Sequence, residues 1–210
     1  MKIRTSLATA VAALLVCAAA DARTLRWRAL DVHAKVEASG ELSIRERHTM
    51  VFDGDWNGGE RTFRSVPGQQ FVFKSISRVD PATGTATGLT ESNPPSRVDQ
   101  YAWTGPGALR WRVRLPSDPP LRNRELIYDI EYSLRHVLLQ DGDIYRLDHD
   151  FAFANRDGNI ERFTVALELD PVWSVVPEGP ALTFERRGVP PGDIVRGQFT
   201  FRYGDEGVPQ

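Results

Sequence analysis

Apolar and polar residues alternate with a period of two along much of the chain beyond residue 22, and no long stretch there keeps a helical period. Such alternation is typical of β-strands with one buried face. Every second position of residues 30–36 is apolar, and a second row of this kind runs over residues 42–52. The polar turn at residues 38–41 is too short for a crossover, so the two rows predict an antiparallel hairpin.

The middle of the second row is polar, because Glu46 and His48 stand where apolar residues are expected. Two interpretations are open. The side chains form a buried polar pair whose hydrogen bonds offset the cost of desolvation, or the strand twists toward solvent at this point. We favour the second interpretation.

Further rows of the same kind predict more strands, at residues 62–65, 71–79, 109–115, 126–134, 145–153, 163–169, 182–186 and 195–203. Two of these segments, 109–115 and 126–134, are expected to pair as a hairpin that places Arg114 opposite Glu125 and Arg110 opposite Asp129.

Turn signals separate the predicted strands. Asp141-Gly142-Asp143 marks one turn, Asp157-Gly158-Asn159 predicts a hairpin, and residues 189–192 are expected to close a last hairpin. Residues 53–59 and 80–96 are expected to be loops. About ten short strands predict an all-β fold, an antiparallel β-sandwich of the Ig-like kind formed by residues 23–210.

Residues 1–22 have the layout of a secretory signal peptide, with a basic start, a short apolar run and a small-residue exit. Cleavage is expected near residues 20–22, which places the mature protein in the periplasm or outside the cell. Cys17, the one cysteine, lies in this segment, and the preceding Leu14-Leu15-Val16 resembles a lipobox with Val16 in place of a small residue. We favour ordinary cleavage, and lipidation is the alternative.

Charge and cysteine content exclude several classes of function. The formal net charge of −2 becomes −3 when Lys2, Arg4 and Asp21 leave with the signal peptide. This balance lacks the concentrated basic face of a nucleic-acid-binding protein. Without Cys17 the mature chain has no thiol, so cysteine nucleophiles and zinc ribbons are excluded.

The loop at residues 53–59 is a candidate calcium site. Asp53, Asp55 and Asn57, followed by Gly58, copy the first half of an EF-hand loop. The twelfth position is Arg64 instead of glutamate, so Glu60 is the expected closing ligand. The alternative, which we favour, is a polar hairpin loop without a metal, and no other cofactor is expected.

The same region also predicts a binding surface. Trp56 stands in a polar, glycine-rich loop and is expected to be exposed, where a tryptophan can anchor a partner. The candidate binding residues are therefore Trp56, Asn57 and Arg64.

A second group of acidic residues offers an enzymatic alternative. Its members are Asp141, Asp143, Asp148, His149 and Asp150, with His136 near them in the sequence. A pair of carboxylates could act as acid and base on a glycosidic bond. Charged side chains on an edge strand that prevent aggregation are the commoner explanation, so we assign no catalytic residue.

Several landmarks together resemble a known family. They are the hairpin at residues 38–46, Phe52-Asp53-Gly54, Phe63-Arg64-Ser65-Val66-Pro67, the turn at 141–143 with Tyr145, and the strand 163–169 ended by Pro171. Over about residues 27–175 the chain resembles the N-terminal domain of the predicted membrane proteins called domain of unknown function 2207. Ile144-Tyr145-Arg146 replaces the family's Glu-x-Tyr-Trp motif, and the family's transmembrane helices are not expected in this chain, which ends at Gln210.

The resemblance implies an extracytoplasmic sandwich and no catalytic residue. We therefore expect a noncatalytic interaction or sensing module of the bacterial envelope, whose partner is an envelope or membrane protein and not a nucleic acid. The alternative is an envelope carbohydrate-active enzyme that uses the acidic group at residues 141–150. A relative of a membrane protein that has lost its anchor is the third possibility.

Overall fold

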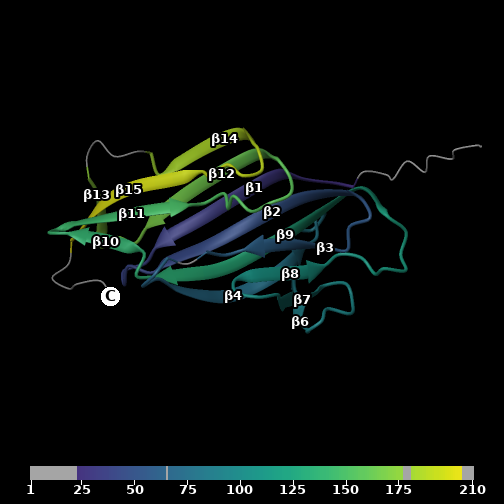
Figure 1. The fold of residues 1–210 in the computed structure, drawn as a ribbon. Coiled ribbons are helices and arrows are strands. Elements are labelled where there is room, and N and C mark those ends of the chain that lie inside the picture. Colours follow the sequence, from purple (N-terminus) through teal and green to yellow (C-terminus); the bar gives the residue numbers. More distant parts are fainter. Residues whose placement is uncertain (1–22, 65, 177–180, 205–210) are drawn as a thin grey trace, which may run out of the picture.

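The computed structural model describes residues 23–64, 66–176 and 181–204, which form β-strands and no helix (Figure 1). The predicted signal peptide and Cys17 lie outside these residues. The strands are β1 (Thr24–Val36), β2 (Leu42–Gly54), β3 (Gly58–Thr62), β4 (Gln70–Val79), β5 (Ala86–Gly88), β6 (Thr90–Glu91), β7 (Gln100–Trp103), β8 (Ala108–Arg112), β9 (Leu121–Arg135), β10 (Leu138–Asp141), β11 (Ile144–Asp150), β12 (Ile160–Leu169), β13 (Trp173–Val175), β14 (Thr183–Val189) and β15 (Arg196–Tyr203). The all-β prediction is confirmed.

The strands form one large sheet and two small ones. The seven-stranded sheet has the order β14-β12-β1-β2-β9-β4-β5, and the four-stranded sheets have the orders β10-β11-β15-β13 and β3-β8-β7-β6. The predicted hairpin of residues 30–36 and 42–52 is confirmed as β1 and β2, in antiparallel register from Thr24 opposite Asp53 to Val36 opposite Leu42. Not every pair is antiparallel, because β1 runs parallel to β12 and β6 runs parallel to β7.

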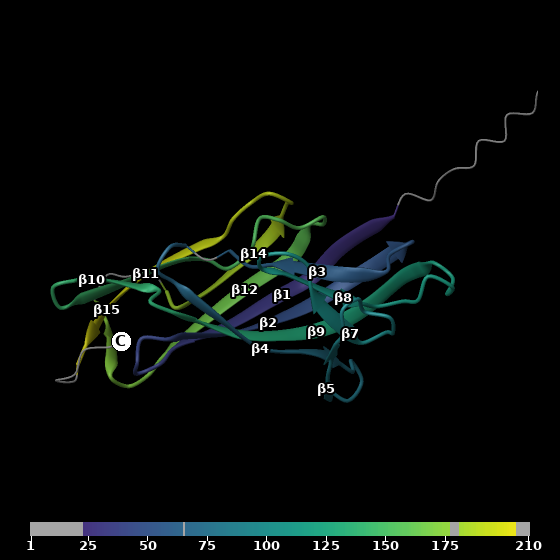
Figure 2. The same cartoon turned by 60° about the horizontal axis from the view of Figure 1, so that its bottom comes forward.

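One hydrophobic core joins the three sheets. The inward row of β1 is buried from Leu30 to Val36, as the alternation predicts. Phe63, which follows β3, packs on Tyr132 of β9, and Trp111 of β8 packs on Tyr128 of the same strand. Figure 2 shows β3 and β8 lying over β2 and β9.

The predicted pairing of residues 109–115 with 126–134 is wrong. β8 pairs with β3 and β7, whereas β9 lies between β2 and β4 in the large sheet. Arg110 forms an ion pair with Glu60, and Asp129 accepts two hydrogen bonds from Arg47 of β2 at 2.8 and 2.7 Å. The proline-containing connection between β8 and β9 leads from one sheet to another, so these two consecutive strands do not pair.

The hairpins predicted at residues 157–159 and 189–192 are also wrong. The first connection leads from β11 in a small sheet to β12 in the large sheet, and the second leads from β14 in the large sheet to β15 in the small one. In both cases the chain changes layers where a turn signal suggested a return to the neighbouring strand. Two smaller differences from the prediction concern short strands. β3 begins at Gly58 instead of residue 62, and the expected loop 80–96 contains the short strands β5 and β6.

The connection between β11 and β12 packs directly on the backbone of β1. The backbone N–H of Trp27 donates to the carbonyl oxygen of Asn159 at 2.9 Å. A Cβ atom added to Gly158 would lie 2.0 Å from the carbonyl oxygen of Leu25. Only glycine therefore fits at this contact.

Gly158→Ala is expected to lower the free energy of unfolding by about 1–3 kcal/mol, which is the usual cost of overpacking. Chemical denaturation followed by tryptophan fluorescence measures the change. Gly88→Ala is the matched control, because a Cβ atom there meets nothing within 4 Å. Equal losses in the two variants would contradict the prediction.

Candidate functional site

An open cleft of about 580 Å³ lies where the start of β1, the loop after β2, the strands β3 and β8, and the β11–β12 connection come together. Its volume falls within the range typical of ligand pockets, about 300–1,000 Å³. Three tryptophans line it, namely Trp27, Trp56 and Trp111. Segments far apart in the sequence therefore build this surface together.

Trp56 is partly buried, which corrects the expectation of an exposed side chain. Its Nε1–H donates to the carbonyl oxygen of Thr24 at 2.9 Å. One ring contact is with Phe52, edge to face at 6.4 Å, and the Arg23 guanidinium carbon lies 4.4 Å from the ring centroid. These contacts hold the indole against the start of β1 and fix its orientation in the cleft wall.

The structure brings two of the three candidate binding residues into the cleft. Asn57 is exposed and lines it beside Trp56. Arg64 is not part of the lining, but its Nη2 donates to Oδ1 of Asn155 at 3.0 Å, and Asn155 lines the cleft. Arg64 thus supports the cleft indirectly, from the end of the β3 segment.

The four residues of the predicted calcium site have partners within the protein. Asp53 Oδ1 accepts the backbone N–H of Asn123 at 3.1 Å, and Glu60 forms its ion pair with Arg110. Asp55 and Asn57 both accept from Nη2 of Arg114. Within the described ranges no group of three or more His, Cys, Asp or Glu side chains is placed to hold a metal ion. The Arg114 guanidinium occupies the position between Asp55 and Asn57 where a calcium ion would bind them both. Calcium binding stays a prediction.

Arginines also pair with most of the second acidic group. Asp141 pairs with Arg146 at 3.2 Å, Asp143 with Arg202 at 3.1 Å and Asp148 with Arg196 at 3.2 Å. The remaining aspartate, Asp150, accepts the backbone N–H groups of Ala152 and Val195 with Oδ1, at 3.1 and 2.9 Å. His136 has a positive φ of 54° at the end of β9. The enzymatic alternative stays a prediction.

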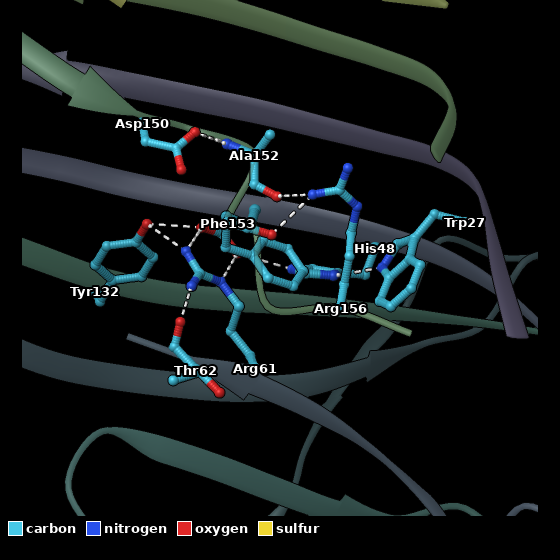
Figure 3. A network of polar contacts seen from close by, with 10 residues as sticks. Trp27, His48, Arg61, Thr62, Tyr132, Asp150, Ala152, Phe153 and Arg156 are labelled. Carbon is cyan, nitrogen blue, oxygen red and sulfur yellow. Dashed lines mark hydrogen bonds and ion pairs between the residues drawn. The ribbon is translucent and has the colours of Figure 1, made fainter. Parts of the chain in front are cut away.

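A buried polar cluster lies behind the cleft, and Figure 3 shows it from close by. Glu46 and His48 are both 0% exposed, so the favoured interpretation of a strand turned toward solvent is wrong. Arg61 of β3 donates to both carboxylate oxygens of Glu46, from Nε at 2.9 Å and from Nη2 at 2.7 Å. The Tyr132 hydroxyl donates to the same carboxylate at 2.7 Å.

The Trp27 indole fixes the protonation pattern of His48. Its Nε1–H donates to Nδ1 of His48 at 3.0 Å, so that nitrogen is an acceptor without a proton. Nε2 then carries the proton and donates to Oε2 of Glu46 at 2.8 Å. Because Trp27 also lines the cleft, it is the physical link between the cleft and the buried cluster.

Charges within the cluster shift the pKa values of its members strongly. Burial raises the pKa of the Glu46 carboxyl, but the charge and hydrogen bonds of Arg61 outweigh burial and hold it well below its usual range. The pKa of Arg61 is correspondingly raised by Glu46. Burial and the Glu46 charge raise the pKa of Tyr132 well above its usual value. Arg61 also lies 4.5 and 4.2 Å from the ring centroids of Phe63 and Phe153.

Sequence reasoning missed Arg61, Tyr132 and Trp27 as members of this cluster. A signal was available, since a carboxylate and an imidazole at inward positions of a strand require partners from other strands. Which arginine supplies the charge depends on how the sheets pack, and this could not be read from the alternation.

His149 is a further ionisable group close to the cluster. Its Nε2 is buried and has no hydrogen-bond partner among the described residues, and its ring packs on Phe151 at 4.8 Å. Burial and the positive charge of Arg61 lower the pKa of His149 to about 4. The folded protein therefore keeps this imidazole neutral in mild acid.

Arg61→Met is expected to cost about 3–5 kcal/mol of stability, because it leaves the buried Glu46 carboxylate without its cation. Arg26→Met is the matched control. Arg26 pairs with Glu161 at 2.6 Å, with side chains that are 38% and 44% exposed, and such a surface ion pair contributes only about 0–1 kcal/mol. Equal losses of unfolding free energy in urea would contradict this prediction.

Stability is expected to fall as the pH drops from about 6.5 to 4, by up to about 3 kcal/mol. In this window the unfolded chain protonates His149, whereas the folded chain does not because its pKa is about 4. The free energy of unfolding, measured by chemical denaturation at several pH values, should change less with pH in His149→Phe. In the control His33→Phe, whose ring is exposed, its change with pH should match that of the unmodified protein. The prediction fails if His149→Phe keeps the slope of the unmodified protein.

Two solved structures show a distant similarity to the chain. One is a candidate protease from Parabacteroides distasonis, with 10% identity, a TM-score of 0.41 and coverage of 85% of this chain and 40% of that chain. Another is an M1 zinc metallopeptidase from Deinococcus radiodurans, with 13% identity, a TM-score of 0.47 and coverage of 85% and 42%. The chain thus spans less than half the length of these proteins. No curated protein matches it.

The family model described as "Predicted membrane protein (DUF2207) N-terminal domain" matches residues 27–201. This match extends beyond residues 27–175, the range of the sequence resemblance, and it includes most of β15. No helix in the described ranges is long and apolar enough to cross a membrane. The chain belongs to the DUF2207 family of N-terminal domains of predicted membrane proteins.

Proposed function

We propose that the chain is a noncatalytic, exported interaction module of the bacterial envelope, with an Ig-like sandwich fold. Its binding surface is the cleft around Trp56, and its partner is another component of the envelope or the membrane. Membership of a family of predicted membrane proteins supports a location at the cell envelope. The observation that carries the proposal is the cleft itself, which gathers exposed polar groups around a fixed indole.

The composition of the cleft favours binding. Trp56 and the arginines are residue types that often dominate binding energy, because they combine large contact area with directed hydrogen bonds. Asn57 and Asn155 add exposed amide groups that can donate and accept. The indole of Trp56 is already ordered by Thr24 and Phe52, so little side-chain entropy is lost there when a ligand binds.

The positions of the most perturbed ionisable groups favour a noncatalytic role. Glu46, Arg61 and Tyr132 have strongly shifted pKa values, a property that often marks catalytic residues. All three are buried, and they satisfy one another with hydrogen bonds. A substrate in the cleft would meet Trp27 before it could reach them. Their role in this proposal is to hold the sheets together behind the binding surface.

Site-specific photocrosslinking in living cells tests the proposal. A photoreactive residue at position 57 or 110, within the cleft, is expected to give one defined adduct with an envelope component. The control position is 33, which is exposed on β1 outside the cleft and is expected to give none of that adduct.

Excess purified domain added to isolated envelopes is expected to compete for the same adduct, and Trp56→Ala domain is expected to compete poorly. The absence of an adduct from both cleft positions, or the same adduct from position 33, would overturn the proposed binding surface.

A further inference from the structure

The cleft carries positive charge on a protein whose net charge is negative. Four arginines line it, namely Arg23, Arg110, Arg112 and Arg156, against two carboxylates, Glu60 and Asp157. The whole chain has a formal net charge of −2. Glu60 pairs with Arg110, and Asp157 is exposed. The other three arginines therefore give the cleft its positive charge.

Arg23 is an available cation at the mouth of the cleft. It is exposed, and it forms no ion pair or side-chain hydrogen bond with any residue in the described ranges. Its guanidinium lies 4.4 Å from the centroid of the Trp56 ring. A stacked guanidinium keeps its N–H edges free for hydrogen bonds to an anion.

Arg112 is held in place by neutral groups alone. Its Nε donates to the carbonyl oxygen of Pro95 at 2.8 Å, and its Nη1 donates to the carbonyl oxygen of Arg114 at 3.4 Å. No carboxylate of the described chain forms an ion pair with it. Arg112 is thus a positioned, partly buried cation whose charge is not neutralised within the protein.

Arg156 is the strongest observation, because it is only 8% exposed and has no carboxylate partner among the residues described. Its Nη1 donates to the carbonyl oxygens of Ala152, Phe153 and Asp193 at 3.1, 2.9 and 3.0 Å. Its Nη2 donates to those of Val189 and Pro190.

Figure 3 shows the Arg156 side chain beside Trp27, with its guanidinium turned to Ala152 and Phe153. Its Nε is buried and has no acceptor within the described chain. A buried N–H donor without an acceptor is costly, and here it belongs to a residue of the cleft wall.

We infer that the cleft binds an anionic saccharide, through a carboxylate or phosphate group that contacts Arg23 and Arg112 near the positive charge of Arg156, while the sugar ring packs on Trp56. The inference rests on the proposed function, because it names the chemistry of the ligand that the cleft takes. Guanidinium groups match the geometry of carboxylate and phosphate oxygens, and Asn57 and Asn155 can bond sugar hydroxyls.

Binding of defined saccharides to the purified chain tests the inference. The probes are a galacturonic acid trisaccharide, glucose 6-phosphate and neutral maltotriose, titrated with tryptophan fluorescence as the signal because three tryptophans line the cleft. One or both anionic probes are expected to bind at least tenfold more tightly than maltotriose, and the affinity is expected to fall as salt is raised. Which of the two binds distinguishes a carboxylate from a phosphate source.

Variants locate the site. Arg23→Gln changes an exposed side chain that the fold does not need, and it is expected to raise Kd for the anionic probe. The double variant Arg23→Gln/Arg112→Gln is expected to raise Kd at least tenfold. Arg45→Gln is the matched control, because Arg45 is an exposed arginine of β2 outside the cleft. Thermal melting of each variant confirms that it is folded.

Equal affinity for maltotriose, no binding of either anionic probe, or an unchanged Kd in the folded double variant would overturn the inference. These outcomes are separate from failure of the proposed function. If positions 57 and 110 still crosslink to an envelope component while the anionic probes do not bind, the cleft is a binding surface whose ligand is not an anionic saccharide. If the probes bind and no crosslink forms, the assignment of a macromolecular partner fails instead.

Discussion

The ion pair between Glu46 and Arg61 joins two sheets at the centre of the molecule. Glu46 comes from β2 in the large sheet and Arg61 from β3 in a small one, while Phe153, which follows β11 of the other small sheet, packs on the same guanidinium. A charge pair in an apolar core is costly unless every donor and acceptor is used. His48 and Tyr132 supply the missing hydrogen bonds. The relative placement of the three sheets is therefore constrained by directed bonds as well as by hydrophobic contact.

Local patterns in the sequence were informative about strands and much less so about their partners. The rows from Leu30 to Val36 and from Leu42 to Phe52 predict β1, β2 and their antiparallel pairing, because the turn between them is too short for a crossover. The alternation at residues 109–115 correctly predicts a strand, but its sequence neighbour β9 is the wrong partner, because β8 pairs with β3 and β7. A strand that leaves its layer has the same alternation as one that stays, so connections such as residues 157–159 could not be told from hairpins.

The same limit applies to the cleft. Trp56, Asn57 and Arg64 could be singled out because they lie in one loop and the strand segment after it. Arg23, Arg112 and Arg156 lie far apart in the chain, and only the packing of β8 and the β11–β12 connection against the start of β1 places them on one surface. The candidate ligands Asp53, Asp55 and Asn57 followed a genuine pattern of oxygen atoms. The structure adds Arg114, which follows β8 and whose side chain donates to two of them, Asp55 and Asn57.

The position of β1 in the middle of the large sheet has a consequence for how the protein folds. One edge of β1 pairs with β2, whereas the other pairs in parallel with β12, so Val36 lies opposite Leu169. Closing such a distant pair carries a large loop-closure entropy and gives slow folding. Until β12 has been made and has docked, β1 presents an unpaired edge, on which another chain could add a strand. The first strand of this domain thus reaches its final environment only when nearly the whole sequence is available.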